Sequence, residues 1–144
     1  MKPLPHRYEL RLAGGPEGYA TAGSEGLPDL RCAPPLDFDG PGDAWSPEHL
    51  LLNAVSTCFL FTLRSVANLS KFRFNALDLA AEGIVDRNQG VTRFTEIILR
   101  PKLMVPQGTK REQAVRIMEK AEKACLVSAS LSTPVRLEPE VMWP

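Results

Sequence analysis

The longest apolar segment of the chain has the pattern of a buried helix. From Leu50 to Leu63, apolar residues occupy every side of a helical projection. The polar interruptions are Asn53, Ser56, Thr57 and Thr62. Upstream, Ser46 is a favourable N-cap and Pro47 suits the first helical position. The pattern predicts a helix from Pro47 to about Leu69 that is enclosed on all sides, which in a short chain indicates a partner subunit.

Alternation of apolar and polar residues predicts strands on both sides of this helix. Residues 7–15, RYELRLAGG, are typical of a strand that ends at a double glycine, and partner strands are expected near residues 19–22 and 30–33. Beyond the helix, residues 72–86 and 92–105 alternate with a period of two and flank the sequence RNQG. They predict a hairpin of two long strands.

A second helix and a last strand complete the predicted order. Thr109 is a cap candidate for a helix over Lys110–Ala124, whose apolar residues fall along one side. Residues 125–134 are expected to form a short turn or helical piece, and residues 135–141 a strand. The order of strands, helix, hairpin, helix and strand predicts a single α+β domain over residues 1–144.

The net charge and the length of the apolar segments exclude several classes of function. The 144 residues include 17 Lys+Arg and 17 Asp+Glu, a formal net charge of zero. This balance argues against nucleic acid or an anionic membrane as a partner. The N-terminus lacks the apolar stretch of a signal peptide, and charged or polar residues interrupt every apolar segment before it reaches the length of a membrane span. We expect a soluble, cytoplasmic protein.

The three cysteines, Cys32, Cys58 and Cys125, are too few and too far apart for a secreted disulfide framework. They form no C-x-x-C pair, and His6 and His49 add no metal-ligand spacing, so no metal is expected. Free cysteine is also a common buried residue. Core packing and redox chemistry are the two roles that remain, and Cys32 is interpreted as a strand residue.

The motif around Cys58 resembles the OsmC/Ohr family of organic hydroperoxide reductases. The sequence WSPEHLLLNAVSTCF, residues 45–59, places Pro47 and Glu48 before a run of leucines and Cys-Phe ten residues after the glutamate. The family's second mark is a cysteine just after the second helix, and Cys125 holds that position. Because the order of elements also matches, the resemblance extends over most of the chain.

The resemblance implies an intertwined homodimer of α+β subunits that reduces organic or hydrogen peroxides. Cys58 would be the peroxidatic nucleophile and Cys125 the resolving thiol, joined in a Cys58–Cys125 disulfide after each turnover. A dithiol, for some family members a lipoylated protein, would reduce that disulfide. Glu48 matches a glutamate that, paired with an arginine, shapes the peroxide site at the subunit boundary. The resemblance implies no metal or bound cofactor.

Reactivity of Cys58 requires a lowered pKa, because only the thiolate attacks a peroxide and an ordinary thiol is mostly protonated at neutral pH. Cys58 lies about three turns into its helix, beyond the reach of the helix dipole, and burial would raise its pKa. We therefore expect a cation from elsewhere in the fold. Glu48 lies roughly 15 Å from Cys58 along the helix axis, so it must act through another chain or segment.

The family arginine has no direct counterpart. In one branch it lies in the glycine turn that here reads GGPEG, where Pro16 takes its place, and in another in the loop that here reads LDFDGPGDAW. The nearest substitute is Arg31, followed by Arg7 and Arg11. Leu126 also replaces the proline that usually follows the second cysteine. These departures favour an alternative, a non-catalytic dimer of the same fold that binds a small apolar ligand or senses oxidants.

Overall fold

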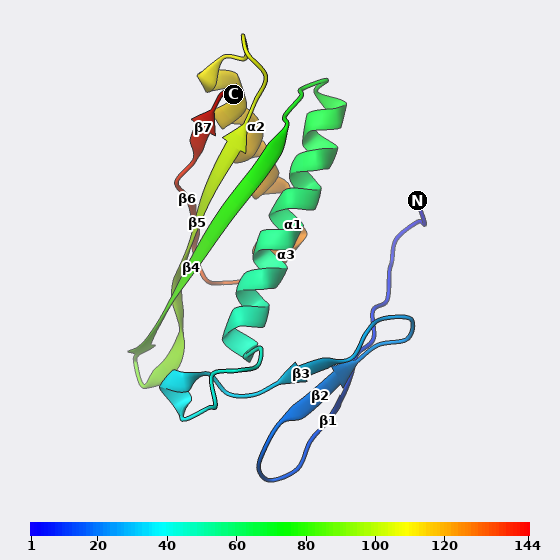
Figure 1. Cartoon of the computed structure of the whole chain (residues 1–144), viewed down its shortest axis with the longest axis vertical. Coiled ribbons are helices and arrows are strands. Elements are labelled where there is room, and N and C mark those ends of the chain that lie inside the picture. Colours follow the sequence, from blue (N-terminus) through cyan, green and yellow to red (C-terminus); the bar gives the residue numbers. More distant parts are fainter. The chain divides into compact units, whose positions relative to one another are not determined.

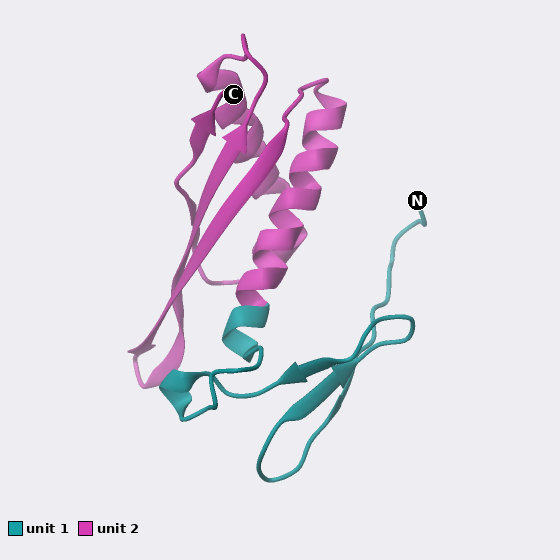
Figure 2. Ribbon diagram, in the orientation of Figure 1, with its two compact units in different colours: residues 1–50 teal, residues 51–144 magenta.

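The computed structural model describes all 144 residues, and its backbone divides into two compact units, residues 1–50 and residues 51–144 (Figure 2). The elements run in the order β1 (Arg11–Ala13), β2 (Ala20–Gly23), β3 (Leu30–Cys32), a 3₁₀ turn (Leu36–Phe38), α1 (Pro47–Leu69), β4 (Ala76–Asn88), β5 (Val91–Met104), α2 (Arg111–Ala124), α3 (Leu126–Ala129), β6 (Val135–Leu137) and β7 (Glu140–Met142) (Figure 1). The predicted α+β class is confirmed, whereas the single domain stays a prediction.

The first unit is a small antiparallel sheet in the order β1-β2-β3. Its strands have three or four residues, shorter than the sequence pattern predicts at β1, and all of β1 is exposed. The unit ends with the first turn of α1. There the backbone N–H of His49 donates to Oγ of Ser46 over 3.1 Å, which confirms Ser46 as the N-cap.

The second unit is built on the predicted hairpin of β4 and β5. Its turn consists of Gln89 and Gly90, both with positive φ (53° and 78°), the backbone signature of the tight turn that suits twisted antiparallel strands. The sequence expectation had placed the turn over the four residues RNQG. The predicted last strand divides into β6 and β7, which both pair in parallel with β5.

One face of this sheet carries the hydrophobic core. Because β4 and β5 alternate, Leu79, Leu99 and Leu103 point to the same face, where α1 and α2 cover them. The fully buried residues contributed by the two helices follow the helical period: Val55, Phe59, Leu63, Ala114, Met118 and Ala121. The core thereby fixes which sides of α1 and α2 face away from the sheet.

The bounds of α1 agree with the prediction, and the chain by itself buries one side of the helix, so burial on all sides by a partner subunit stays a prediction. Only Val55, Phe59, Leu63 and Ala67 are buried, a single stripe spaced by four residues. The side chain of Phe61 is 54% exposed. By length and composition alone, α1 would also qualify as a membrane span, contrary to the sequence expectation. One such helix is weak evidence for a membrane span, and the buried stripe shows that one side of α1 packs in the core.

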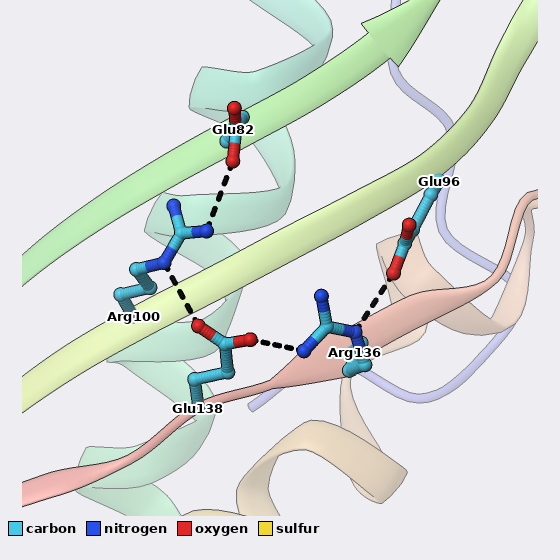
Figure 3. Close-up of polar contacts among 5 residues, drawn as sticks. All are labelled: Glu82, Glu96, Arg100, Arg136 and Glu138. Carbon is cyan, nitrogen blue, oxygen red and sulfur yellow. Dashed lines mark hydrogen bonds and ion pairs between the residues drawn. The ribbon is translucent and has the colours of Figure 1, made fainter.

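The opposite face of the sheet carries alternating charges (Figure 3). Arg100 on β5 donates to Glu82 on β4 and to Glu138, each over 2.9 Å. Arg136 on β6 also pairs with Glu138 and donates to Glu96 over 2.7 Å. Ile98 lies on this face in register with Glu82 and Arg136, yet only 4% of it is exposed. The long charged side chains therefore cover it with their aliphatic parts.

Candidate active site

The second unit brings the two predicted redox cysteines together. Cys58 precedes the buried Phe59 on α1, and its side chain is half-buried. Cys125 lies between α2 and α3, where it occupies the N-cap position of α3 and is 1% exposed. The two thiols lie within hydrogen-bonding reach, and each changes the pKa of the other. Helix packing thus joins residues that lie 67 positions apart in the sequence.

The pKa of Cys58 is lowered. Burial acts against this and is the largest single influence, but four hydrogen bonds to the sulfur together outweigh it. The donors are the Cys125 thiol, the backbone N–H groups of Val127 and Leu126, and the hydroxyl of Thr62. Within this chain, hydrogen bonds lower the pKa of Cys58 and no cation is among the causes. The expected cation beside the Cys58 thiolate stays a prediction.

The pKa of Cys125 is raised. Burial is the main cause, the hydrogen bond to Cys58 and the charge of the Cys58 thiolate act in the same direction, and the backbone N–H and hydroxyl of Ser128 oppose them. Of the two thiols, Cys58 is therefore the one that loses its proton more readily. This difference is in the direction that the two predicted roles require.

Cys58 opens into a pocket of about 510 Å³ between α1 and the first turn of α3. Its walls are mostly apolar and comprise Ala54, Thr57, Phe61, Thr62, Ser65, Leu126 and Val127. Arg64, one turn beyond Leu60 on α1, places its guanidinium 5.1 Å from the centre of the Phe61 ring. A small apolar molecule can therefore reach the Cys58 sulfur directly, whereas Cys125 lies behind it.

Glu48 lies in the first unit, in the first turn of α1. Its Oε1 atom is buried and has no hydrogen-bond partner. Together with Cys32, Ala33, Pro35 and Phe38 it lines a second pocket of about 380 Å³. A buried carboxylate oxygen usually has a donor, so this one is available to a donor from another segment.

Arg31, the predicted substitute for the family arginine, also lies in the first unit. Its guanidinium donates to the backbone carbonyl of Asp43 over 3.0 Å and stacks on the ring of Tyr19 at 4.4 Å. The hydroxyl of Tyr19 donates to the Asp43 carboxylate over 2.8 Å. The three side chains form one exposed cluster, and the placement of Arg31 beside Cys58 stays a prediction.

Sequence reasoning missed the donors around the cysteines. Thr62 lies one helical turn after Cys58, and Ser128 lies three residues after Cys125, spacings that place a hydroxyl beside each sulfur. The sequence signal was present, but Thr62 had been interpreted only as a polar interruption. The structure brings no group of three His, Cys, Asp or Glu side chains together in a metal-binding arrangement.

Comparisons with known proteins agree with this architecture. The family model described as OsmC-like protein matches residues 40–140. The uncharacterized protein YmaD of Bacillus subtilis (strain 168) is 31% identical over 109 residues, which cover 74% of this chain and 73% of the relative.

Two solved structures share the fold. The OsmC-like protein of unknown function VCA0330 from Vibrio cholerae has a TM-score of 0.85 and 18% identity, with 94% of this chain and 99% of that chain covered. An organic hydroperoxide resistance protein from Elizabethkingia anophelis has a TM-score of 0.78 and 22% identity, with both chains fully covered.

Proposed function

Because this chain belongs to the OsmC-like protein family, we propose that it is a thiol-dependent peroxidase that reduces organic hydroperoxides. The observation that carries the proposal is the contact between Cys58 and Cys125, whose thiol pKa values are moved in opposite directions. The name of the Elizabethkingia relative, an organic hydroperoxide resistance protein, points the same way. The apolar pocket at Cys58 suits a hydroperoxide with an organic group.

In the first step the Cys58 thiolate attacks the terminal oxygen of the hydroperoxide. The O–O bond breaks, Cys58 becomes a sulfenic acid, and the leaving alkoxide takes a proton from solvent to give the alcohol. Cys125 then attacks the sulfenic sulfur, water leaves, and the Cys58–Cys125 disulfide forms. A dithiol reductant restores both thiols and supplies the two electrons, so the cycle uses no metal or organic cofactor.

We propose a homodimer as the working unit. Beyond its buried stripe, α1 exposes apolar surface such as Phe61 and Leu69, and Leu126 is exposed next to the pocket. In the first unit, Leu10 and Leu12 are likewise exposed. A second copy would cover such surfaces, in keeping with the intertwined homodimer that the family resemblance implies. The same proposal includes a cytoplasmic location, where thiols remain reduced.

Glu48 and Arg31 are proposed to complete the peroxide site at the subunit boundary. The unpartnered Oε1 of Glu48 supports this role, since it leaves a buried acceptor for a donor from another segment. Glu48→Gln and Arg31→Ala should each slow peroxide consumption while leaving the acidity of the Cys58 thiol in place. A change in the pKa of Cys58 would instead show that Glu48 and Arg31 act on the cysteine thiol and not on the peroxide.

The test is consumption of cumene hydroperoxide with dihydrolipoamide as reductant. Turnover should require both Cys58 and Cys125, and Cys32→Ser should retain it. After one equivalent of peroxide, the mass of the chain should fall by two hydrogen atoms without formation of a covalent dimer. The absence of an arginine from GGPEG and from LDFDGPGDAW favours the alternative of a non-catalytic ligand-binding or oxidant-sensing dimer. A disulfide that forms without turnover would select that alternative.

A further inference from the structure

Ser128 lies next to Cys125, and the fold leaves its hydroxyl group without a hydrogen-bond partner. Cys125 is the N-cap residue of α3, and Ser128 is the third residue of that helix, the position from which backbone N–H groups bond to a capping side chain. The hydroxyl oxygen of Ser128 is buried and has no hydrogen-bond partner in the dithiol state. Its backbone N–H and hydroxyl both favour the charged form of Cys125. A neutral thiol is a weak acceptor, whereas a thiolate is a strong one.

The two sulfurs also differ in access. Cys58 lines the open pocket, whereas Cys125 is 1% exposed. A thiolate that reduces a disulfide approaches one sulfur and expels the other. In a Cys58–Cys125 disulfide, an external thiol can approach only the Cys58 sulfur through the pocket. Cys125 must therefore be the leaving group.

Expulsion of Cys125 as a thiolate is difficult without help, because burial raises the pKa of this thiol and a leaving thiol of high pKa leaves slowly. The Cys58 thiolate adds to the difficulty only while it is free, through its charge and its hydrogen bond. Once Cys58 is bonded to the reductant, both effects are lost. What remains is burial, opposed by the two donors of Ser128.

We propose that Ser128 is a positioning residue for disulfide reduction, whose hydroxyl holds the Cys125 sulfur as the leaving thiolate while a dithiol attacks Cys58. The inference rests on the proposed two-cysteine cycle. A reductant thiolate bonds to the Cys58 sulfur, the Cys58–Cys125 bond breaks, and its electron pair stays on Cys125. The second thiol of the reductant, as its thiolate, then attacks the reductant sulfur in the mixed disulfide and releases the Cys58 thiolate. The reductant leaves as a cyclic disulfide, and a proton from solvent returns to Cys125.

The direction of attack is tested on a disulfide made with diamide, so that the outcome does not depend on peroxide chemistry. The oxidised protein is mixed with glutathione, quenched early with N-ethylmaleimide and mapped by peptide mass. Glutathione should be found on Cys58 and maleimide on Cys125. The reverse labelling would overturn the proposal. If glutathione attacks the diamide-formed disulfide as expected but peroxide does not oxidise the two cysteines, only the proposed peroxidase function fails.

The role of Ser128 is tested by the reduction rate of the same preformed disulfide with dihydrolipoamide. Ser128→Ala should slow reduction about three- to tenfold, the range expected when a leaving thiolate loses one hydrogen bond. Ser128→Thr, which keeps the hydroxyl, should restore the rate. Ser130→Ala is the matched control, because the Ser130 hydroxyl donates to the backbone carbonyl of Leu126 over 2.8 Å. Equal rates for Ser128→Ala and Ser130→Ala would overturn the proposal.

A second readout separates this role from a general loss of structure. In a Cys32→Ser, Cys58→Ser background, where Cys125 is the one thiol left, the thiolate absorbance at 240 nm gives the titration of Cys125 directly. Ser128→Ala should move that titration to higher pH, and Ser128→Thr should not. In the native background, alkylation of Cys58 by iodoacetamide should be nearly unchanged by Ser128→Ala. An unmoved Cys125 titration would show that the hydroxyl does not act on the sulfur.

Discussion

The Sγ atom of Cys58 lies 3.8 Å from the Oγ1 atom of Thr62, one turn further along the same helix. Thr57, the neighbour of Cys58, directs its hydroxyl to the backbone carbonyl of Asn53 instead, over 2.8 Å. Both threonines line the pocket, but only one of them bonds to the sulfur. The helix therefore offers one hydroxyl that contacts the Cys58 sulfur and a neighbouring one that serves as its control.

Thr62→Val should make Cys58 less reactive. The substitution keeps the branched shape and removes a donor that lowers the pKa of the thiol. Iodoacetamide alkylation of Cys58 at pH 7 should slow about three- to fivefold, the factor that corresponds to one hydrogen bond of about 1 kcal/mol. Thr57→Val should leave the rate near that of the parent protein. If the two variants behave alike, the hydroxyl of Thr62 does not stabilise the thiolate.

The pH dependence of the alkylation rate of Cys58 should reveal its contact with Cys125. Because the pKa of Cys58 is lowered, the alkylation rate should reach half of its plateau below the pH of an ordinary thiol, which is about 8.5. Cys125→Ala removes the hydrogen bond that contributes most to that lowering, so the midpoint should move to higher pH. Cys32→Ala should not move it, since the Cys32 thiol faces the backbone carbonyl of Leu30. A midpoint that Cys125→Ala leaves unchanged would contradict the contact between the thiols.

Gly83 should be intolerant of a side chain. A Cβ atom at this position of β4 would lie 2.5 Å from the ring of Phe94 and 3.0 Å from Leu52, so the contact between α1 and the sheet would have to open. Gly83→Ala should destabilise the protein by about 1–3 kcal/mol, the usual cost of overpacking, in a urea unfolding experiment. Gly15→Ala is the control, because its Cβ would meet no atom within 4 Å. Equal stability of the two variants would mean that the helix and the sheet adjust freely.

Elements with strong local signals could be predicted from the sequence. The start of α1 follows from Ser46 and Pro47, whose preferences act within one helical turn. The hairpin follows from alternation, although the turn is Gln89-Gly90, because the pairing of Asn88 with Val91 extends both strands. Burial around α1 could not be predicted in the same way, since an apolar pattern does not tell which surfaces the chain itself covers.

The candidate site also combines features that a local motif predicts with features that depend on the folded structure. The resemblance identified Cys58 and Cys125 because their flanking residues form a readable motif. The acidity of Cys58 could not be derived, since it depends on backbone N–H groups of Leu126 and Val127 that point at the sulfur only when α3 has formed. A search for charged partners missed it, because hydroxyl and amide donors leave no charge signal in the sequence.

Glu138 should contribute stability that disappears in acid. Hydrogen bonds from Arg136 and Arg100 hold the pKa of Glu138 below its ordinary value (Figure 3). A carboxyl group with a lower pKa in the folded state than in the unfolded state stabilises the fold above the unfolded value of about 4.3. That contribution decreases as the pH falls through the folded pKa. The group is exposed, so the effect should be small and should weaken with added salt.

The test compares Glu138→Gln with Glu140→Gln, which removes the same charge from a β7 residue that makes none of the ion pairs of this sheet face. At pH 7, Glu138→Gln should unfold at a lower urea concentration than Glu140→Gln. Below the folded pKa of Glu138 the two midpoints should converge, because the parent carboxyl is then neutral as well. A difference that persists unchanged in acid would show that the amide introduced by Glu138→Gln disturbs the cover over Ile98 rather than the ion pairs.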